Sequence, residues 1–242
     1  MIKDALQYIV GLKAPNLEEI NGDTYSDKPL HRIDTYIPRA EPIRMNTLTS
    51  LLDYIISKVD SMSEKMIIQV VSPEEVKLFS CLNDNREREC LVEVKAQIPS
   101  FHYERFIDHE TFLINVQSKF LDKPETDKAL LLKFAGTVEA GTVANYGDDG
   151  VTQKATVSTG IASKADAIVP NPVKLAPFRT FVEVPQPISE FIFRIKQDKY
   201  EGILCAIFEA DGGAWKNEAM NKIHSFLEEK LKDYKDKFIV IS

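Results

Sequence analysis

Residues 202–231 read GILCAIFEADGGAWKNEAMNKIHSFLEEKL, and this stretch decides the fold class. Gly202 to Phe208 is an apolar run typical of a buried strand, and Asp211-Gly212-Gly213 supplies turn residues directly after it. From Trp215 to Leu231 the apolar residues recur at helical spacing. The chain shows neither a GxGxxG motif nor a regular alternation of strands and helices, so the pattern favours an α+β fold over a doubly wound parallel sheet.

Periodicity predicts further elements on the N-terminal side of this stretch and one beyond it. A helix is expected at residues 46–58, and two shorter central helices follow, one capped by Asp108 and one running from Pro124 to Gly141. Prolines interrupt residues 151–195 so often that edge strands and loops are expected there. Period-2 and β-branched segments predict mostly antiparallel strands at residues 66–71, 76–82, 91–94 and 238–241.

The first 45 residues differ from the rest of the chain. They hold a short amphipathic stretch at residues 5–10, and prolines then recur with little periodicity at Pro15, Pro29, Pro38 and Pro42. This composition predicts an extended N-terminal arm over residues 1–45 and a single α+β domain over residues 46–242. Such an arm can pack across its own domain or reach a neighbouring subunit, and the sequence leaves both open.

Composition limits the classes of function. The 242 residues carry a formal charge of −7, so any contact with nucleic acid would need a local basic patch. The three cysteines show no CxxC spacing, which fits a reducing cytoplasm. An apolar run of the roughly 20 residues that cross a bilayer is missing, as is a signal-peptide pattern, so we expect a cytoplasmic protein without a membrane partner.

Four strings in the second half of the chain carry a resemblance: DDGVTQ at 148–153, LAPFRTF at 175–181, QPISEF at 186–191 and FEADGGAW at 208–215. In this order they resemble the YfdQ-like family of phage and prophage proteins, from about Lys65 to about Leu231. The resemblance implies a phage setting, close to early DNA metabolism or interference with the host, and it implies no catalytic residue. The signature positions are Phe178, Arg179, Gln186, Phe191, Gly212, Gly213 and Trp215.

Two pairs of carboxylates are candidates for a metal or ligand site. Asp148 and Asp149 lie in a Gly-Asp-Asp-Gly sequence that could hold a divalent cation, although the same residues are ordinary hairpin-turn chemistry. Glu209 and Asp211 lie at a strand-to-helix junction where an anion or a metal could bind, although a capping role for Asp211 explains the residue types without a ligand and is the favoured interpretation. No cofactor other than such a cation is expected.

Arg179 is the residue most indicative of a specific interaction. An arginine between Phe178 and Phe181 often fixes an internal carboxylate or a contact between subunits. Basic and aromatic residues around it could also stack on single-stranded nucleic acid, but alternating strands with a charged outer face account for the same composition.

Three functional hypotheses follow. The first is a non-enzymatic, self-associating phage protein of the host cytoplasm that binds a host or phage component of DNA metabolism or defence. The second is a structural protein whose N-terminal arm links copies into a ring or shell. The third is a metal-dependent nuclease or nucleotide-processing enzyme that uses Asp148, Asp149 and either Glu209 or Asp211.

Overall fold

The computed structural model describes residues 2–11, 15–20, 23–29, 39–62, 65–137, 143–148, 153–159, 163–168 and 171–242. The chain divides into two compact units, Met1–Arg39 and Ala40–Ser242. Each unit is described by itself below.

The N-terminal unit contains regular structure where an extended arm was expected. Helix α1 spans Ile2–Gly11, and strands β1 (Leu17–Ile20) and β2 (Asp23–Ser26) pair as an antiparallel hairpin. Pro15 and Pro29 lie outside these elements, so they flank the helix and the hairpin without interrupting either. The description of this segment as extended is therefore corrected over residues 2–11, 17–20 and 23–26.

A five-stranded sheet forms one half of the larger unit, with the strand order β14-β4-β5-β6-β3. Its central strands are β4 (Met66–Ser72), β5 (Glu75–Ser80) and β6 (Cys90–Lys95), and they pair antiparallel. The edge strands β3 (Ile43–Met45) and β14 (Phe238–Ile241) run parallel to their neighbours. Because β3 pairs with β6, residues 43–45 belong to this sheet, although the sequence placed them in the arm.

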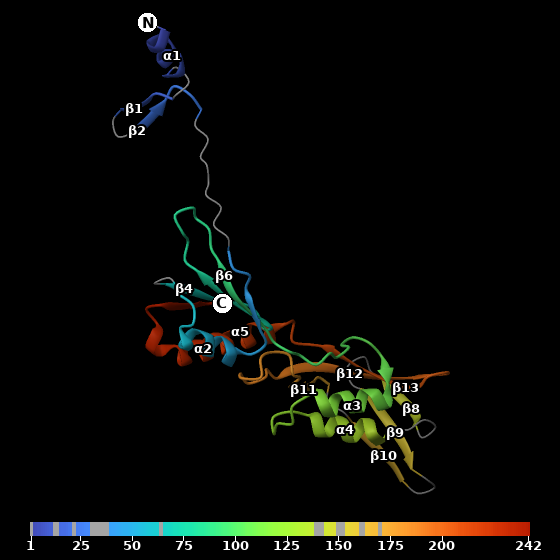
Figure 1. Cartoon of the computed structure of the whole chain (residues 1–242). Helices are drawn as coiled ribbons and strands as arrows, with labels where there is room; N and C mark the ends of the chain where they lie inside the picture. The colour runs from blue at the N-terminus through green and yellow to red at the C-terminus, as the bar shows by residue number, and fades with distance from the viewer. Residues whose placement is uncertain are drawn as a thin grey trace. The chain divides into compact units, whose positions relative to one another are not determined.

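Two helices pack on one face of this sheet (Figure 1). Helix α2 spans Leu48–Ser57, and helix α5 spans Ala214–Lys230 and is followed by a short 3-10 turn at Lys232–Tyr234. Side chains alternate along β4, so that Met66, Ile68 and Val70 are buried beneath the helices. The apolar stripe of α5, including Ile223 and Leu227, completes this first core.

A second core lies between a four-stranded sheet and two helices. The strand order is β11-β12-β13-β7, with β11 at Val173–Leu175, β12 at Ser189–Asp198, β13 at Gly202–Glu209 and β7 at Ile107–Asp108. Helices α3 (His109–Lys119) and α4 (Lys128–Thr137) lie side by side along it (Figure 1). Phenylalanines from both layers fill the core, namely Phe112, Phe120, Phe134, Phe191 and Phe193.

A three-stranded antiparallel sheet of β8 (Val143–Asp148), β9 (Gln153–Thr159) and β10 (Ser163–Ile168) completes the described elements. The expected absence of helix between residues 151 and 195 holds for the part of this range that the structure describes. The prediction of an α+β fold with mostly antiparallel sheets and a long C-terminal helix is confirmed.

The first residues of the helices show where short-range sequence signals predicted a helix start correctly and where they did not. Asp108 accepts a hydrogen bond from the Thr111 N–H at 2.8 Å, so the predicted cap at Asp108 is confirmed. At the start of α2, Thr47 accepts one from the Ser50 N–H at 3.1 Å. The second central helix begins at Lys128 rather than at Pro124, because residues 124–126 form a turn closed by a hydrogen bond from the Thr126 N–H to the Lys123 carbonyl. Gly141, its expected end, lies outside the described residues.

Candidate functional site around Arg179

The loop over residues 176–188, between β11 and β12, is held in place by one buried amide side chain. Gln186 Oε1 accepts the backbone N–H groups of Arg179 at 2.9 Å and Thr180 at 3.1 Å. Gln186 Nε2 donates to the carbonyls of Phe181 at 3.0 Å and Thr180 at 3.3 Å. The amide thus replaces the backbone partners that a strand or helix would have provided to this irregular segment.

The same loop is bonded to the first core. Thr180 Oγ1 donates to the Pro73 carbonyl at 2.6 Å, in the turn between β4 and β5. Glu183 Oε1 accepts the N–H of Thr49 at 3.1 Å, in the first turn of α2. These two bonds fix the loop against the first core of the larger unit.

Arg179 lies at the centre of this arrangement and is only 4% exposed. Its Nη1 donates to Glu209 Oε1 at 3.0 Å, and its Nη2 donates to Ser189 Oγ. The guanidinium carbon lies 3.9 Å from the centroid of the Trp215 ring, a cation–π stack of the kind that strengthens when desolvated. Burial lowers the pKa of Arg179, and the nearby acidic groups oppose this shift.

Asp211 extends the network through Ser189. Burial alone would raise the pKa of Asp211, but hydrogen bonds from Ser189 and from the Gly213 N–H, together with the charge of Arg179, lower it below its usual value. The Gly213 N–H donates to Asp211 Oδ1 at 3.0 Å. Gly212 and Gly213 have φ values of 62° and 81°, which glycine adopts without strain, and they turn the chain from β13 into α5.

Tyr103 closes another side of the cluster. Its ring stacks on Phe191 with centroids 5.8 Å apart, and burial raises its pKa to about 12. The Tyr103 hydroxyl is therefore protonated at neutral pH and can act as a hydrogen-bond donor.

A groove of about 780 Å³ adjoins these residues, within the usual range for ligand sites. Its walls come from the β4–β5 turn, from residues 98–104, from the 176–188 loop and from the start of α5. Both Arg179 and Trp215 line it. Arg179 Nε and Trp215 Nε1 are buried and have no hydrogen-bond partner among the residues that the structure describes.

The structure brings together most of the residues singled out in the sequence. Arg179 binds the carboxylate of Glu209, an internal carboxylate of the kind expected for it. Phe178 and Trp215 line the groove, Phe191 packs beneath Arg179, and Gln186 holds the loop. The sequence did not single out Ser189, Tyr103 or Glu104 as site residues. Tyr103 and Glu104 lie far from the 176–188 loop in the chain, and no short-range sequence signal predicts that the fold brings them beside it.

The other pair of acidic candidates lies in a different sheet. Asp148 is the last residue of β8 and pairs with Gln153 of β9, so it precedes a hairpin connection, while Asp149 lies outside the described residues. Among the described residues, no three His, Cys, Asp or Glu side chains lie close enough together to hold a metal ion. The described helices include none that is long and apolar enough to cross a membrane.

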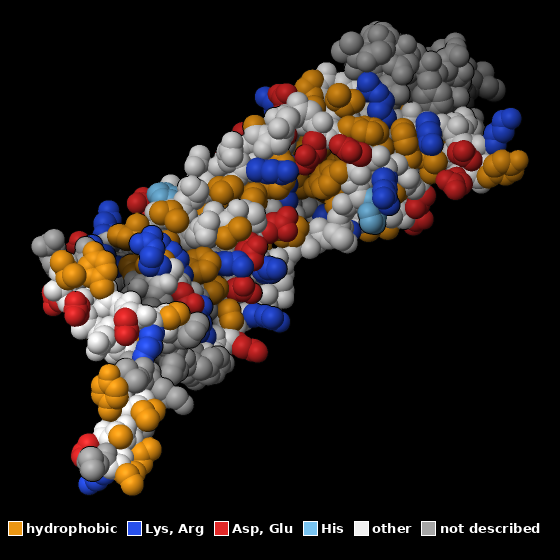
Figure 2. Space-filling model, turned by 90° about the horizontal axis from the view of Figure 1, so that it is seen from above, with side chains coloured by type: hydrophobic (Ala, Val, Ile, Leu, Met, Phe, Trp, Pro, Cys, Tyr) orange, Lys and Arg blue, Asp and Glu red, His pale blue; other side chains and the backbone are white. Residues whose placement is uncertain are grey.

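Basic and acidic side chains are interspersed over the face shown in Figure 2. A protein that follows the backbone of a nucleic acid presents a continuous basic stripe, so this face does not favour such a contact.

Comparisons with protein families, with curated proteins and with solved structures find no match to this chain.

Proposed function

We propose that this chain is a non-enzymatic, self-associating phage protein of the host cytoplasm that binds a protein component of host or phage DNA metabolism or defence. The observation that carries the proposal is the groove beside Arg179: Arg179 and Trp215 line it, and each holds a buried N–H donor that has no partner among the described residues. A buried donor without a partner costs about 1–3 kcal/mol, and an acceptor on a bound partner would recover this energy. The phage setting rests on the resemblance to the YfdQ-like family.

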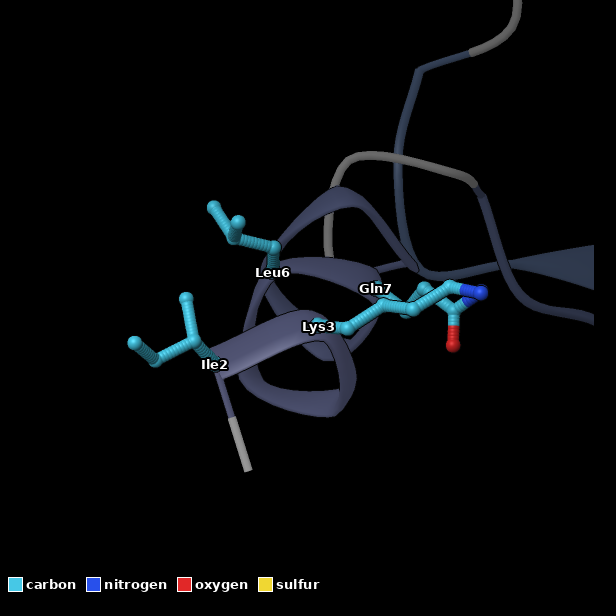
Figure 3. Close-up of a pocket in the computed structure, with 4 residues that line it drawn as sticks. All are labelled: Ile2, Lys3, Leu6 and Gln7. Carbon is cyan, nitrogen blue, oxygen red and sulfur yellow. The ribbon is translucent and has the colours of Figure 1, made fainter.

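Self-association is supported by the N-terminal unit. Ile2 is 81% exposed and Leu6 is 57% exposed, and both project to the same side of α1, while Lys3 and Gln7 project to another (Figure 3). Tyr8 and Ile9 are exposed as well. A helix with this many uncovered apolar side chains gains free energy by packing against another surface, and a second copy of the chain is the partner always present.

A comparative capture experiment tests the binding function. Wild-type protein and the Trp215→Phe variant are immobilised and exposed to extract of the host bacterium, and the retained proteins are identified. Phenylalanine keeps an aromatic face for Arg179 but removes the indole N–H. We expect a defined protein to be retained by wild type and lost from Trp215→Phe.

The matched control for this experiment is Tyr200→Ala, at a 96% exposed position in the β12–β13 turn, away from the groove-lining residues. Identical sets of proteins on wild type and Trp215→Phe would refute binding at the groove. Circular dichroism of both variants establishes that each is folded.

The assembly of copies into a ring or shell is a second candidate, favoured by the same exposed face of α1. Deletion of residues 1–39 removes the N-terminal unit and leaves β3 in its sheet. If the unit links the copies, light scattering should show a large closed particle for the full chain and a monomer or dimer for the deletion. An unchanged mass would exclude this role for the unit.

A further inference from the structure

Two residues that line the groove carry N–H donors without a partner among the described residues, and these donors define the atom type that a ligand group would need to complete them. Arg179 and Trp215 are 4% and 8% exposed, and their side-chain nitrogens donate hydrogen bonds but cannot accept them. The groups that complete them must therefore be hydrogen-bond acceptors, such as carbonyl oxygens. An extended peptide presents carbonyl oxygens at regular intervals along its length, whereas a folded helix has already used its own.

The lining of the groove fits an extended segment that contains proline. Aromatic rings from three separate segments, Tyr103, Phe178 and Trp215, share it with Pro73 and Pro99. Grooves lined by aromatic residues hold polyproline II segments, because the preformed extended helix loses little conformational entropy on binding.

The charges at the groove indicate a basic ligand. Its walls carry Glu74, Glu104 and Glu209 against Arg179 and Lys216. Glu209 is paired with Arg179, whereas the carboxylates of Glu74 and Glu104 are exposed and form no ion pair with the described residues. This excess of negative charge opposes a phosphate-containing ligand and complements a lysine or arginine side chain.

We propose that the groove beside Arg179 binds an extended, proline-containing segment of a partner protein that carries at least one basic side chain. Arg179 Nε and Trp215 Nε1 are buried in the free chain, so the carbonyl oxygens of the segment accept from them after the two side chains shift toward the groove. Its prolines pack on Tyr103 and Phe178, and its basic group lies by Glu74 and Glu104. This inference rests on the proposed binding function and specifies the partner chemistry.

Trp215 is the single tryptophan of the chain, so its fluorescence reports on this groove alone. The probe is a synthetic twelve-residue peptide made of repeated Pro-Pro-Arg triplets, and it is titrated into full-length protein at low salt. Its matched control replaces each arginine with glutamate and keeps the prolines. We expect a saturable change in Trp215 emission with the arginine peptide, and at least about tenfold weaker binding of the glutamate peptide.

Variants separate the contribution of the groove carboxylates to peptide affinity from the contribution of the Trp215 hydrogen bond. Glu74→Gln combined with Glu104→Gln should weaken the arginine peptide about fivefold and reduce its salt dependence. Trp215→Phe, measured by calorimetry, should weaken both peptides about two- to tenfold through loss of one hydrogen bond. Glu229→Gln, an exposed change on α5 outside the groove, should leave the affinity unchanged.

Either of two results would overturn the inference: no saturable signal at millimolar peptide, or equal binding of the two peptides. Its failure is separable from failure of the proposed function. If the peptides fail while a host protein still depends on the Trp215 N–H in the capture experiment, the groove binds a partner of different chemistry. If both experiments fail, the groove is not a binding site.

Discussion

Helix α1 is regular and exposed, whereas the loop over residues 176–188 is irregular and largely buried. The loop has side-chain partners for its backbone, chiefly Gln186, and bonds to α2 and to the β4–β5 turn. The helix satisfies its own backbone and leaves Ile2 and Leu6 uncovered. Regular local structure and burial are thus independent here: long-range side-chain bonds fix the loop, and the helix still has apolar surface available for another molecule.

The largest effect is expected from breaking the loop. Gln186→Ala removes the acceptor of two backbone N–H groups and the donor to buried carbonyls, all in a region closed to water. We expect a loss of about 3 kcal/mol in the free energy of unfolding, measured by urea denaturation. Gln117→Ala, at an exposed position of α3, is the matched change and should stay within about 0.5 kcal/mol of wild type.

A loss below about 0.5 kcal/mol in Gln186→Ala would mean that the loop is held by its apolar residues, such as Phe181 and Val184, rather than by the amide. The loop and α1 would then differ only in how much apolar surface each buries, and not in how their backbone groups are hydrogen-bonded.

These two regions also show what the sequence could and could not predict. Apolar spacing and caps predicted α2, α3 and α5, because those signals lie within a few residues of one another. The groove depends on Pro73, Tyr103, Arg179 and Trp215, which lie far apart in the chain, so only Arg179, Trp215 and their neighbours were recognised as candidates. The helix and the hairpin of the arm were missed because its prolines suggested extension, although Pro15 and Pro29 lie outside these elements.

A second test addresses the charge network beside the loop. Because its folded-state pKa is lowered, Asp211 contributes stability above the unfolded value near 4, and this stability is lost as the pH falls through the lower folded value. Asp211→Asn should therefore reduce the free energy of unfolding by about 1 kcal/mol at pH 7. The difference from wild type should shrink as the pH is lowered below 4.

Urea denaturation at pH 7, 5 and 3 measures this difference. Asp236→Asn, at an exposed position after α5, should match wild type throughout. A constant deficit of Asp211→Asn at every pH would show that the carboxylate acts through its shape and not through its charge.

A smaller effect is expected at the wall of the groove. Glu104 has a φ of 62°, in the left-handed region that disfavours residues with a Cβ atom. Glu104→Gly should relieve this strain and raise the free energy of unfolding by up to about 1 kcal/mol, while it removes a carboxylate from the proposed peptide site. Stability and binding should thus move in opposite directions.

Arg86→Gly provides the matched change, because Arg86 has a φ of 61° in the exposed β5–β6 connection. It should raise stability similarly and leave peptide affinity unaltered. If Glu104→Gly bound the arginine peptide as well as wild type does, the Glu104 carboxylate would have no part in recognition.

The smallest effect on stability is expected at α1, where the comparison is sharpest. Replacing Ile2 and Leu6 by glutamine removes apolar side chains that contact little in the monomer, so the unfolding free energy of the larger unit should change by less than about 0.5 kcal/mol. The native mass measured by light scattering should nevertheless fall, because the same side chains would be buried between copies. The control is Lys3→Gln, a change on the side of the helix that carries Lys3 and Gln7 (Figure 3). This variant should keep the native mass of the wild type. Unchanged mass in the double variant would assign self-association to another surface, whereas a lower mass without loss of stability would show that α1 is kept for contact between chains and not for the fold.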